Sequence, residues 1–525
     1  MRDFQMPGRS AVYANNGMCA TSHPLAAKVA IEMLESGGNA VDAAIAGAVL
    51  LGICEPMMCG IGGDMFVLLK PAGEERVIAL NASGRAPKGL SAEKMRADGH
   101  KTVPLGGVEA ITMPGGIDGM CRLSADWGCK GLDASLAPAI RYAEEGVPAA
   151  PRTADDWRKT AQALQGDARK FYLSDDAPLA LGQSFRHPEQ ADVLRQIAAK
   201  GRAGFYEGEV AEDMIASLQA MGGTHSMEDL AATKCEYTEP VAGNYRGLDL
   251  IEHPPNGQGA TAILMGNILS HFDLGALEPF GAARAHLEAE AAKLAYDARN
   301  RFLADPDYTT RLAHMLAPET GAALAGLIHP NKVIESAAAI SEQVHKDTVY
   351  LTVVDRDGMA VSLIYSIFHG FGSGRASSRF GTLFQNRGAG FTLEAGHPNE
   401  AGGGKRPMHT IIPAMLRENG RFCQSFGVMG GAYQPNGHIR VLSNQVDYGM
   451  DLQAAFDAPR SFPDRGVLQV ERGYSDAVRA ELAAIGHKVE IPATALGGGQ
   501  AIAMDESGVL IGASDPRKDG CALGY

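Results

Sequence analysis

"KDTVYLTVVDRDGMAVSLIYSI", residues 346–367, is the stretch that decides the fold. Its β-branched and apolar residues lie on both sides of Asp357-Gly358, a dipeptide that favours a tight turn, so two antiparallel strands are predicted. Thr348 begins the first strand, where threonine is common for packing reasons alone. The question is whether Thr348 is an ordinary strand residue or the N-terminus of a second chain, formed when the first is cut.

A threonine hydroxyl is a weak nucleophile unless a base lies beside it, and the α-amine freed by a cut before Thr348 can be that base. Such a residue should begin a strand, follow a flexible segment and face N–H groups able to hold an oxyanion. Residues 305–347 carry turn signals and no good strand, so we expect an exposed or mobile connection there. The pair Gly430-Gly431 could present the N–H groups, although its spacing alone favours a plain turn.

The composition is that of a soluble globular protein, with 525 residues, 45% apolar residues and a formal charge of −14. This acidic balance argues against nucleic acid and anionic membrane as partners, since both select for basic patches. The N-terminal residues lack a signal-peptide core, and the eight cysteines show no C-x-x-C pair. We therefore expect reduced, mostly buried cysteines and a cytoplasmic location.

The chain divides into a helical first half and a strand-rich second half. Residues 23–38 and 39–54 predict two helices, the second capped by Asn39 and buried, and 284–304 predict an amphipathic helix. Residues 131–235 are expected to be mostly helical. Further strands are expected at 410–416, 421–428 and 499–512, with a helix near 451–458.

Two glycine-rich segments lack the full pattern of a phosphate-binding loop. "GIGGD", residues 60–64, lacks the third glycine of a dinucleotide fingerprint, and "GGGKR", residues 402–406, lacks the leading glycine and final hydroxyl of a Walker loop. The chain also has no H-E-x-x-H and no G-x-S-x-G motif. Metal and serine-triad chemistry are therefore weakly indicated, and we expect no metal or organic cofactor.

Eight segments in order give the chain its resemblance to the γ-glutamyltransferase family of N-terminal-nucleophile hydrolases. They are "SGGNAVDAAIA" (36–46), "GIGGDMF" (60–66), "MPGGIDG" (113–119), the segment 286–308, "DTVYLTVVDRDGMAVS" (347–362), "KRPMHTIIPAM" (405–415), "MGG" (429–431) and "GASDPR" (512–517). The resemblance covers nearly the whole length. It implies an α+β fold, a four-layer αββα sandwich.

The resemblance also implies self-cleavage between Asp347 and Thr348. Residues 1–347 would form a large subunit and 348–525 a small one, interwoven as a heterodimer that could pair into a dimer of heterodimers. Thr348 would be the nucleophile, Ser366 a hydroxyl that assists it, and Gly430 and Gly431 the oxyanion hole.

The chain departs from the family where the substrate's α-amino group is held. Ala389 and Gly390 stand where an acidic pair is expected, and Phe368 replaces an asparagine. The loss of these groups argues against glutathione, because an ammonium buried without a partner is costly.

The carboxylate-binding residues differ as well. A serine pair becomes His409-Thr410, and the usual arginine is displaced by two places to Arg85. Arg85 and His409 are predicted to bind a carboxylate together with Thr410 and Phe368. Arg85 could instead pair with a structural aspartate, and His409 could be a supporting histidine whose hydrogen bonds are already made.

The predicted activity is hydrolysis of a small anionic amide, with oxamate first and formation of oxalate and ammonia. Within the resembling family this chemistry belongs to purine-derived nitrogen metabolism. The alternatives are a γ-glutamyltransferase or glutathione hydrolase, a glutaryl or cephalosporin acylase, and, outside enzymes, an uncleaved scaffold or binding protein.

Overall fold

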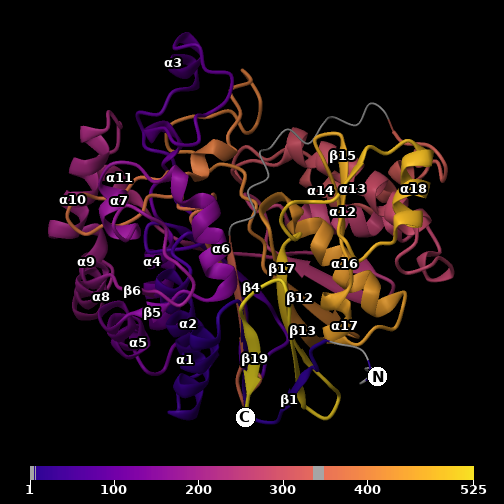
Figure 1. Ribbon diagram of the computed structural model, residues 1–525, viewed down its shortest axis with the longest axis horizontal. Coiled ribbons are helices and arrows are strands. Elements are labelled where there is room, and N and C mark those ends of the chain that lie inside the picture. Colours follow the sequence, from indigo (N-terminus) through magenta and orange to yellow (C-terminus); the bar gives the residue numbers. More distant parts are fainter. Residues whose placement is uncertain (1–4, 6–7, 335–347) are drawn as a thin grey trace.

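The computed structural model describes residue 5 and residues 8–334 and 348–525. Within these residues the main strands form two seven-stranded sheets. The sheets pack face to face, with helices on the outer side of each. Figure 1 shows the layers in order, from α1 and α2 on one side to α12 and α16 on the other. The predicted α+β, four-layer αββα fold is therefore confirmed.

The first sheet has the order β19-β2-β10-β11-β3-β4-β7. Its strands are β19 (Cys521–Gly524), β2 (Met18–Thr21), β10 (Val349–Val354), β11 (Ala360–Ser366), β3 (Asp64–Lys70), β4 (Ile78–Ala82) and β7 (Glu236–Thr238). The pair β10–β11 is the predicted hairpin, and Gly358 in its turn has φ 74°, a conformation that glycine adopts without strain.

The second sheet has the order β1-β18-β17-β13-β12-β9-β8. Its strands are β1 (Val12–Ala14), β18 (Leu510–Ser514), β17 (Gly498–Met504), β13 (Arg421–Met429), β12 (Ala414–Glu418), β9 (Leu248–Glu252) and β8 (Val241–Tyr245). The predicted strand at 499–512 is thus two strands, because residues 505–508 make a turn in which Asp505 accepts the N–H groups of Ser507 and Val509.

Helices with long apolar faces cover the outer side of each sheet. α1 (Pro24–Glu35), α2 (Ala40–Cys54) and α4 (Gly116–Trp127) pack on the first sheet, and α12 (Gly259–Leu269), α16 (Gln434–Val446) and α17 (Leu452–Asp457) on the second. Every residue of α2 is buried, and Asn39 and Asp42 form a reciprocal capping box at its start, as predicted for the cap. The predicted helix 284–304 is α13 (Ala282–Phe302).

Other helices surround this core. They are α3 (Ala92–Ala97), α5 (Leu132–Glu145), α6 (Pro151–Thr160), α7 (Asp167–Tyr172), α8 (Pro188–Lys200), α9 (Ala203–Tyr206), α10 (Gly208–Ala220), α11 (Met227–Ala232) and α18 (Asp476–Ile485). Residues 131–235 are thus mostly helical, as predicted. A small sheet of β14 (Ser461–Asp464), β15 (Val467–Val470) and β16 (Val489–Glu490) lies beside α13 and α18.

The segment 305–347, expected to be an exposed or mobile connection without a good strand, has no strand among its described residues and is largely exposed, but it contains two short helices. Residues 312–316 and 318–325 form α14 (Leu312–Leu316) and α15 (Pro318–Ala325), which pack against α12. Met315 and Ala325 are buried. Because helices this short are only marginally stable alone, tertiary packing supplies most of their stability. Residues 335–347 lie outside the described residues.

The eight cysteines are all free thiols, in agreement with the predicted reduced state. Only Cys19, Cys54 and Cys59 are buried, so the expectation that most are buried is wrong. Among the described residues, none of the helices combines the length and the apolar character that a bilayer crossing requires.

Candidate active site

The period of two along a strand places Thr348 between the two sheets. Val349, Leu351 and Val353 belong to the apolar core shared with α1 and α2. Tyr350 and Thr352 point the other way, towards β13. Tyr350 packs with Met429, and the hydroxyl of Thr352 hydrogen-bonds that of Ser425 at 2.7 Å. Thr348 has the same parity, and its side chain therefore faces the second sheet. It is 1% exposed.

The strand register brings two further polar residues beside Thr348. Val349 pairs with Tyr365, and the same register continued by one residue places Thr348 opposite Ser366. Ser366 in turn pairs with Asp64, the first residue of β3. Thr348, Ser366 and Asp64 thus form a buried row at one end of the first sheet.

The hydroxyl of Ser366 lies beside that of Thr348. Its Oγ accepts the N–H of Phe368 at 2.9 Å and an Nη2–H of Arg387 at 3.2 Å. Thr348 Oγ1 lies 3.3 Å from Ser366 Oγ, and either hydroxyl can be the donor of the hydrogen bond between them.

Arg387 is a buried residue of this cluster that the sequence analysis did not single out. Its side chain is fully buried, donates to Thr410 Oγ1 at 3.0 Å as well as to Ser366, and lies over the ring of Phe368, 4.1 Å from the ring centroid. It lies in "FQNRGAGF", residues 384–391, two residues before Ala389, and this arginine beside the missing acidic pair was the available signal.

His409 lies behind the row. Its Nε2 is 3.0 Å from Asp64 Oδ2, and its backbone N–H donates to Asn256 O at 2.7 Å. Burial, and after it the nearby Arg387 cation, lower the pKa of His409 to about 3, so its imidazole is neutral and donates Nε2–H to the carboxylate. The structure therefore places His409 as a support for Asp64, while its neighbour Thr410 contacts Arg387 directly.

Asp64 ties several segments to this end of the sheet. Its Oδ1 accepts the backbone N–H groups of Gly84 and Gly115 and an Nε2–H of Gln385, all within 3.1 Å. With His409 on Oδ2, the carboxylate is surrounded by donors, which explains how a charge can be fully buried here.

The glycine pair forms a turn directly after β13. Gly430 and Gly431 have φ of 125° and 57°, which only glycine adopts easily, and no described residue accepts a hydrogen bond from either N–H. Gln258 fixes this turn against the next segment, because its Nε2 donates to Gly431 O at 3.1 Å and to Thr410 O at 2.6 Å. The turn therefore has the donors and the rigidity that an oxyanion hole needs.

Arg85 does not lie in this cluster. Its Nη1 donates to Asp305 Oδ2 and to Gly404 O, both at 3.0 Å, and its side chain is 39% exposed. It lines a small cavity of about 70 Å³ that neither Thr348 nor Phe368 lines. Its pairing with a structural aspartate is the alternative that the sequence had left open, and it argues against a direct role in binding.

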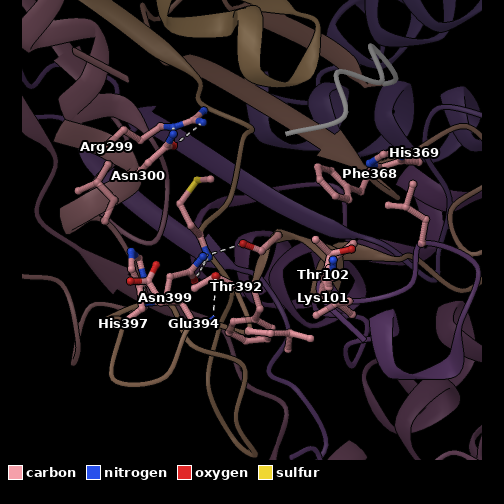
Figure 2. A pocket seen from close by; sticks show the side chains of 18 residues that line it. Lys101, Thr102, Arg299, Asn300, Phe368, His369, Thr392, Glu394, His397 and Asn399 are labelled. Carbon is pink, nitrogen blue, oxygen red and sulfur yellow. Dashed lines mark hydrogen bonds between the residues drawn. The ribbon is translucent and has the colours of Figure 1, made fainter. Parts of the chain in front are cut away.

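A larger cavity of about 350 Å³ adjoins the cluster. Phe368, Ala389 and Gly390 line it, together with Arg299 and Met408. Figure 2 shows Phe368 and His369 together on one side, with Arg299 and Asn300 across from them and Glu394 and His397 at another end. Phe368 has φ 81°, a strained conformation for a bulky residue that costs on the order of 1–3 kcal/mol and is common at functional sites.

One group of metal-ligand side chains occurs elsewhere in the described chain: His286, Glu290 and His487, all buried. Each already has hydrogen-bond partners. His286 contacts His487 and His329 O, both at 2.8 Å, and Glu290 accepts from Lys293 and from the backbone of Ile334, both at 2.6 Å. These contacts account for the group as a hydrogen-bonded cluster.

Comparison with known proteins identifies relatives along almost the whole chain. The sequence pattern of the Gamma-glutamyltranspeptidase family matches residues 26–525. The glutathione hydrolase-like YwrD proenzyme of Bacillus subtilis is 34% identical, over 98% of this chain and 99% of that protein. The oxamate amidohydrolase proenzyme of Klebsiella pneumoniae is 32% identical, over 98% of this chain and 100% of its own length.

Solved structures show the same likeness. The cephalosporin acylase from Bacillus halodurans superposes with a TM-score of 0.92 and 37% identity, covering 100% of this chain and 99% of that one. The Helicobacter pylori gamma-glutamyltranspeptidase matches with a TM-score of 0.58 and 29% identity, over 63% of this chain and 96% of that one.

Proposed function

The chain belongs to the gamma-glutamyltranspeptidase family, whose members are amide hydrolases of the N-terminal-nucleophile type, and from that premise we propose that it cuts itself before Thr348 and then hydrolyses a small amide that bears a carboxylate. The observation that carries the proposal is the row of Thr348 and Ser366, 3.3 Å apart and fully buried, at the head of β10. Residues 1–347 and 348–525 would be the two subunits.

Self-cleavage uses the hydroxyl that later attacks the substrate. Thr348 Oγ1 attacks the carbonyl carbon of Asp347, and the peptide C–N bond breaks as an ester forms. The departing nitrogen becomes the α-amine of Thr348. Water then hydrolyses the ester, which leaves a carboxylate on Asp347 and frees the Thr348 hydroxyl.

Turnover repeats this chemistry on a second amide. Thr348 Oγ1 attacks the amide carbonyl while the α-amine takes its proton, and the N–H groups of Gly430 and Gly431 stabilise the oxyanion. The amine returns the proton to the leaving nitrogen, and ammonia departs. Water, activated by the same amine, hydrolyses the acyl-enzyme. The Ser366 hydroxyl donates to Thr348 Oγ1 throughout and limits the charge that develops there.

Oxamate is our first candidate substrate. Ala389 and Gly390 line the cavity beside Phe368 and offer no carboxylate to an α-ammonium, which disfavours γ-glutamyl compounds. The resemblance to oxamate amidohydrolase over the whole chain supports the same choice. We place the enzyme in the cytoplasm, in the degradation of purine-derived nitrogen compounds.

A second candidate is an acylase that acts on a larger amide. The cavity of about 350 Å³ exceeds what a two-carbon amide needs, and the likeness to a cephalosporin acylase points the same way. The reaction and the nucleophile would be unchanged.

The first test is the intact mass of the denatured protein, beside Thr348→Ala. We expect two fragments that meet between Asp347 and Thr348, and a single chain in the variant. A single uncut chain in both proteins would reject the proposal and favour a scaffold or binding protein.

The second test is the release of ammonia from oxamate beside hydrolysis of γ-glutamyl-p-nitroanilide and glutaryl-p-nitroanilide. Turnover of the γ-glutamyl compound alone would reject oxamate. Turnover of the glutaryl compound alone would favour the acylase.

A further inference from the structure

Gln258 joins two parts of the candidate site that belong to different segments. Its side chain is fully buried at the N-cap of α12, and its Nε2 donates to Thr410 O at 2.6 Å and to Gly431 O at 3.1 Å. Its Oε1 accepts an Nη1–H of Arg299 at 2.8 Å. The oxygen and both N–H groups of the amide are therefore engaged, each with a different segment.

Arg299 determines which way this amide points. A guanidinium donates hydrogen bonds and accepts none, so it holds the oxygen of Gln258 and leaves the two N–H groups for the carbonyls. The reversed amide would direct N–H groups at a cation and an oxygen at two carbonyl oxygens. Arg299 also lines the cavity of about 350 Å³, across from Phe368 in Figure 2, so the orientation is set from the wall of that cavity.

The backbone of the glycine turn fixes the shape of the turn but not its position. Gly430 O accepts the N–H of Tyr433 at 3.0 Å. Gly431 O accepts the N–H of Gln434, besides the amide described above. These backbone bonds lie within the turn. The turn follows a strand of the second sheet, whereas Thr348 directly precedes β10 of the first, so their separation depends on contacts between segments.

A series of hydrogen bonds with donor–acceptor distances of 2.6–3.3 Å crosses from the turn to the nucleophile. In order, its members are Gly431, Gln258, Thr410, Arg387, Ser366 and Thr348. Gln258 links the turn to the rest of the series. Displacing reacting groups by about 1 Å lowers a rate by about 100-fold, so the loss of such a link should be felt in catalysis.

We propose that Gln258 is a positioning residue, which sets the distance between the oxyanion donors and Thr348, and that Arg299 holds its amide in the orientation this requires. The inference rests on the proposed function, since it concerns the same nucleophile and the same glycine turn. Neither residue exchanges a proton or a bond with the substrate. Their effect is on the transition state, in which the oxyanion exists, and therefore on kcat rather than on KM.

The test uses mature protein, cut before Thr348, and any amide of the panel above that the wild type hydrolyses. Gln258→Glu keeps an oxygen for Arg299 but replaces the two N–H donors by a second oxygen. We expect kcat about 100-fold below wild type, with KM within about 3-fold, because the oxyanion exists only in the transition state.

Gln453→Glu is the matched control. Gln453 is a buried residue of α17 outside the series, and its amide donates to Ser514 O at 2.9 Å and accepts the N–H of Ser514 at 3.0 Å. The substitution removes the same donors and should lower the free energy of unfolding in urea, with kcat near the wild-type value. Comparable losses of kcat in both variants would overturn the inference, as would a Gln258→Glu variant with wild-type kcat or with a loss in KM alone.

A protein that is not cut before Thr348 counts against the proposed function instead. If the wild type is cut but hydrolyses no amide of the panel, p-nitrophenyl acetate replaces them. Thr348 Oγ1 then takes the acetyl group and p-nitrophenolate leaves, through an oxyanion of the same kind. We expect the same contrast of about 100-fold between wild type and Gln258→Glu in the rate of acetylation, followed by intact mass. A cut wild type that is not acetylated at Thr348 also counts against the proposed function.

Should Gln258→Glu fail to mature, the pair Arg299→Met and Arg299→Lys decides. Methionine removes the donor and leaves the amide of Gln258 free to turn, so we expect kcat to fall about 10-fold. Lysine keeps a cationic donor and should recover most of that loss. An Arg299→Met variant with wild-type kcat, or an Arg299→Lys variant no more active than Arg299→Met, would reject the inference.

Discussion

Two serines on β11 face the space between the sheets, and only one of them contacts Thr348. Ser366 lies 3.3 Å from the nucleophile, whereas Ser362 bonds the hydroxyl of Tyr350 at 2.6 Å and Ala414 O at 3.1 Å. The same residue type on the same face of one strand therefore performs two different tasks.

We predict that Ser366→Ala lowers kcat of the mature enzyme by about 10–100-fold, because Thr348 Oγ1 loses the donor that supports its charge. Ser362→Ala is the matched control. It removes a buried hydroxyl of the same size and should reduce stability by about 1 kcal/mol while leaving kcat near the wild-type value. Steady-state kinetics together with urea denaturation of both variants checks the contrast, and equal losses of kcat would contradict it.

At this scale the sequence predicted the hairpin that brings Thr348 and Ser366 together, because its register depends on one turn. The catalytic roles of the two residues were implied by the resemblance. Arg85 and Arg387 cannot be ranked in that way, because each is positioned by segments far away in the chain: Asp305 and Gly404 for Arg85, Ser366 and Thr410 for Arg387. A count of arginines near a motif does not tell which one enters the site.

Among the elements, α1 depends on a histidine for its start. His23 is its N-cap, and Nδ1 accepts the N–H of Leu25 at 3.3 Å. Burial lowers the pKa of His23 to about 4, with an opposing effect of Asp519, so the capping nitrogen is unprotonated at neutral pH. Protonation of Nδ1 would remove the acceptor and leave a buried charge.

The resulting prediction concerns pH. The unfolded chain binds a proton at His23 below its ordinary pKa of about 6.5, and the folded chain binds it only near 4. The contribution of this group to stability is therefore complete above pH 6.5 and is lost as the pH falls towards 4. His23→Asn keeps a capping acceptor without the titration, so its free energy of unfolding should fall less steeply in this window, by up to about 1.4 kcal/mol per pH unit.

Urea denaturation of wild type and His23→Asn at pH 7.5, 6 and 5 tests this difference. The same pH dependence in both proteins would show that His23 does not titrate with unfolding.

Asp64 is a second element-level feature, since it anchors the start of β3 to four other segments. Asp64→Ala should cost at least about 3 kcal/mol, because four donors lose their acceptor at a fully buried site. Asp64→Asn should cost less, since the neutral His409 can change tautomer and accept from the new amide. Denaturation curves of the two variants give the comparison, and an equal loss would contradict it.

The elements themselves were largely predictable. Apolar patterns and capping residues located α1, α2 and α13, and β-branched and apolar runs on both sides of a turn signal located β10 and β11. The short helices α14 and α15 escaped prediction because their stability comes from contact with α12 rather than from their own sequence.

For the whole molecule, the decisive feature is that both sheets mix strands from the two sides of residue 348. β10 and β11 lie between β2 and β3, and β12, β13, β17 and β18 lie between β9 and β1. The order of strands in a sheet has no local signature, so the sequence predicted the layers through resemblance and could not have predicted this order from pattern alone.

We predict that the two fragments of the cut protein stay together as one particle. Separating them would break the backbone pairing at three places in the first sheet and at two in the second, and would expose the core between the sheets. Size-exclusion chromatography in native buffer should give one peak that contains both fragments, and 6 M guanidinium chloride, a typical denaturing concentration, should separate them. Fragments that elute apart in native buffer would contradict the interleaved arrangement.

The interleaving also means that the protein can assemble efficiently only once. Before the cut, β2 and β10 belong to one chain, and their meeting is intramolecular, with loop closure as its main entropic cost. Afterwards the same strands belong to separate molecules, and their reunion depends on concentration. Uncut Thr348→Ala should therefore refold after dilution from denaturant at a rate that does not depend on the protein concentration. The mature enzyme should regain its native structure slowly and incompletely in dilute solution. The proposed cut before Thr348 would thus make the native enzyme accessible only by folding of the uncut chain.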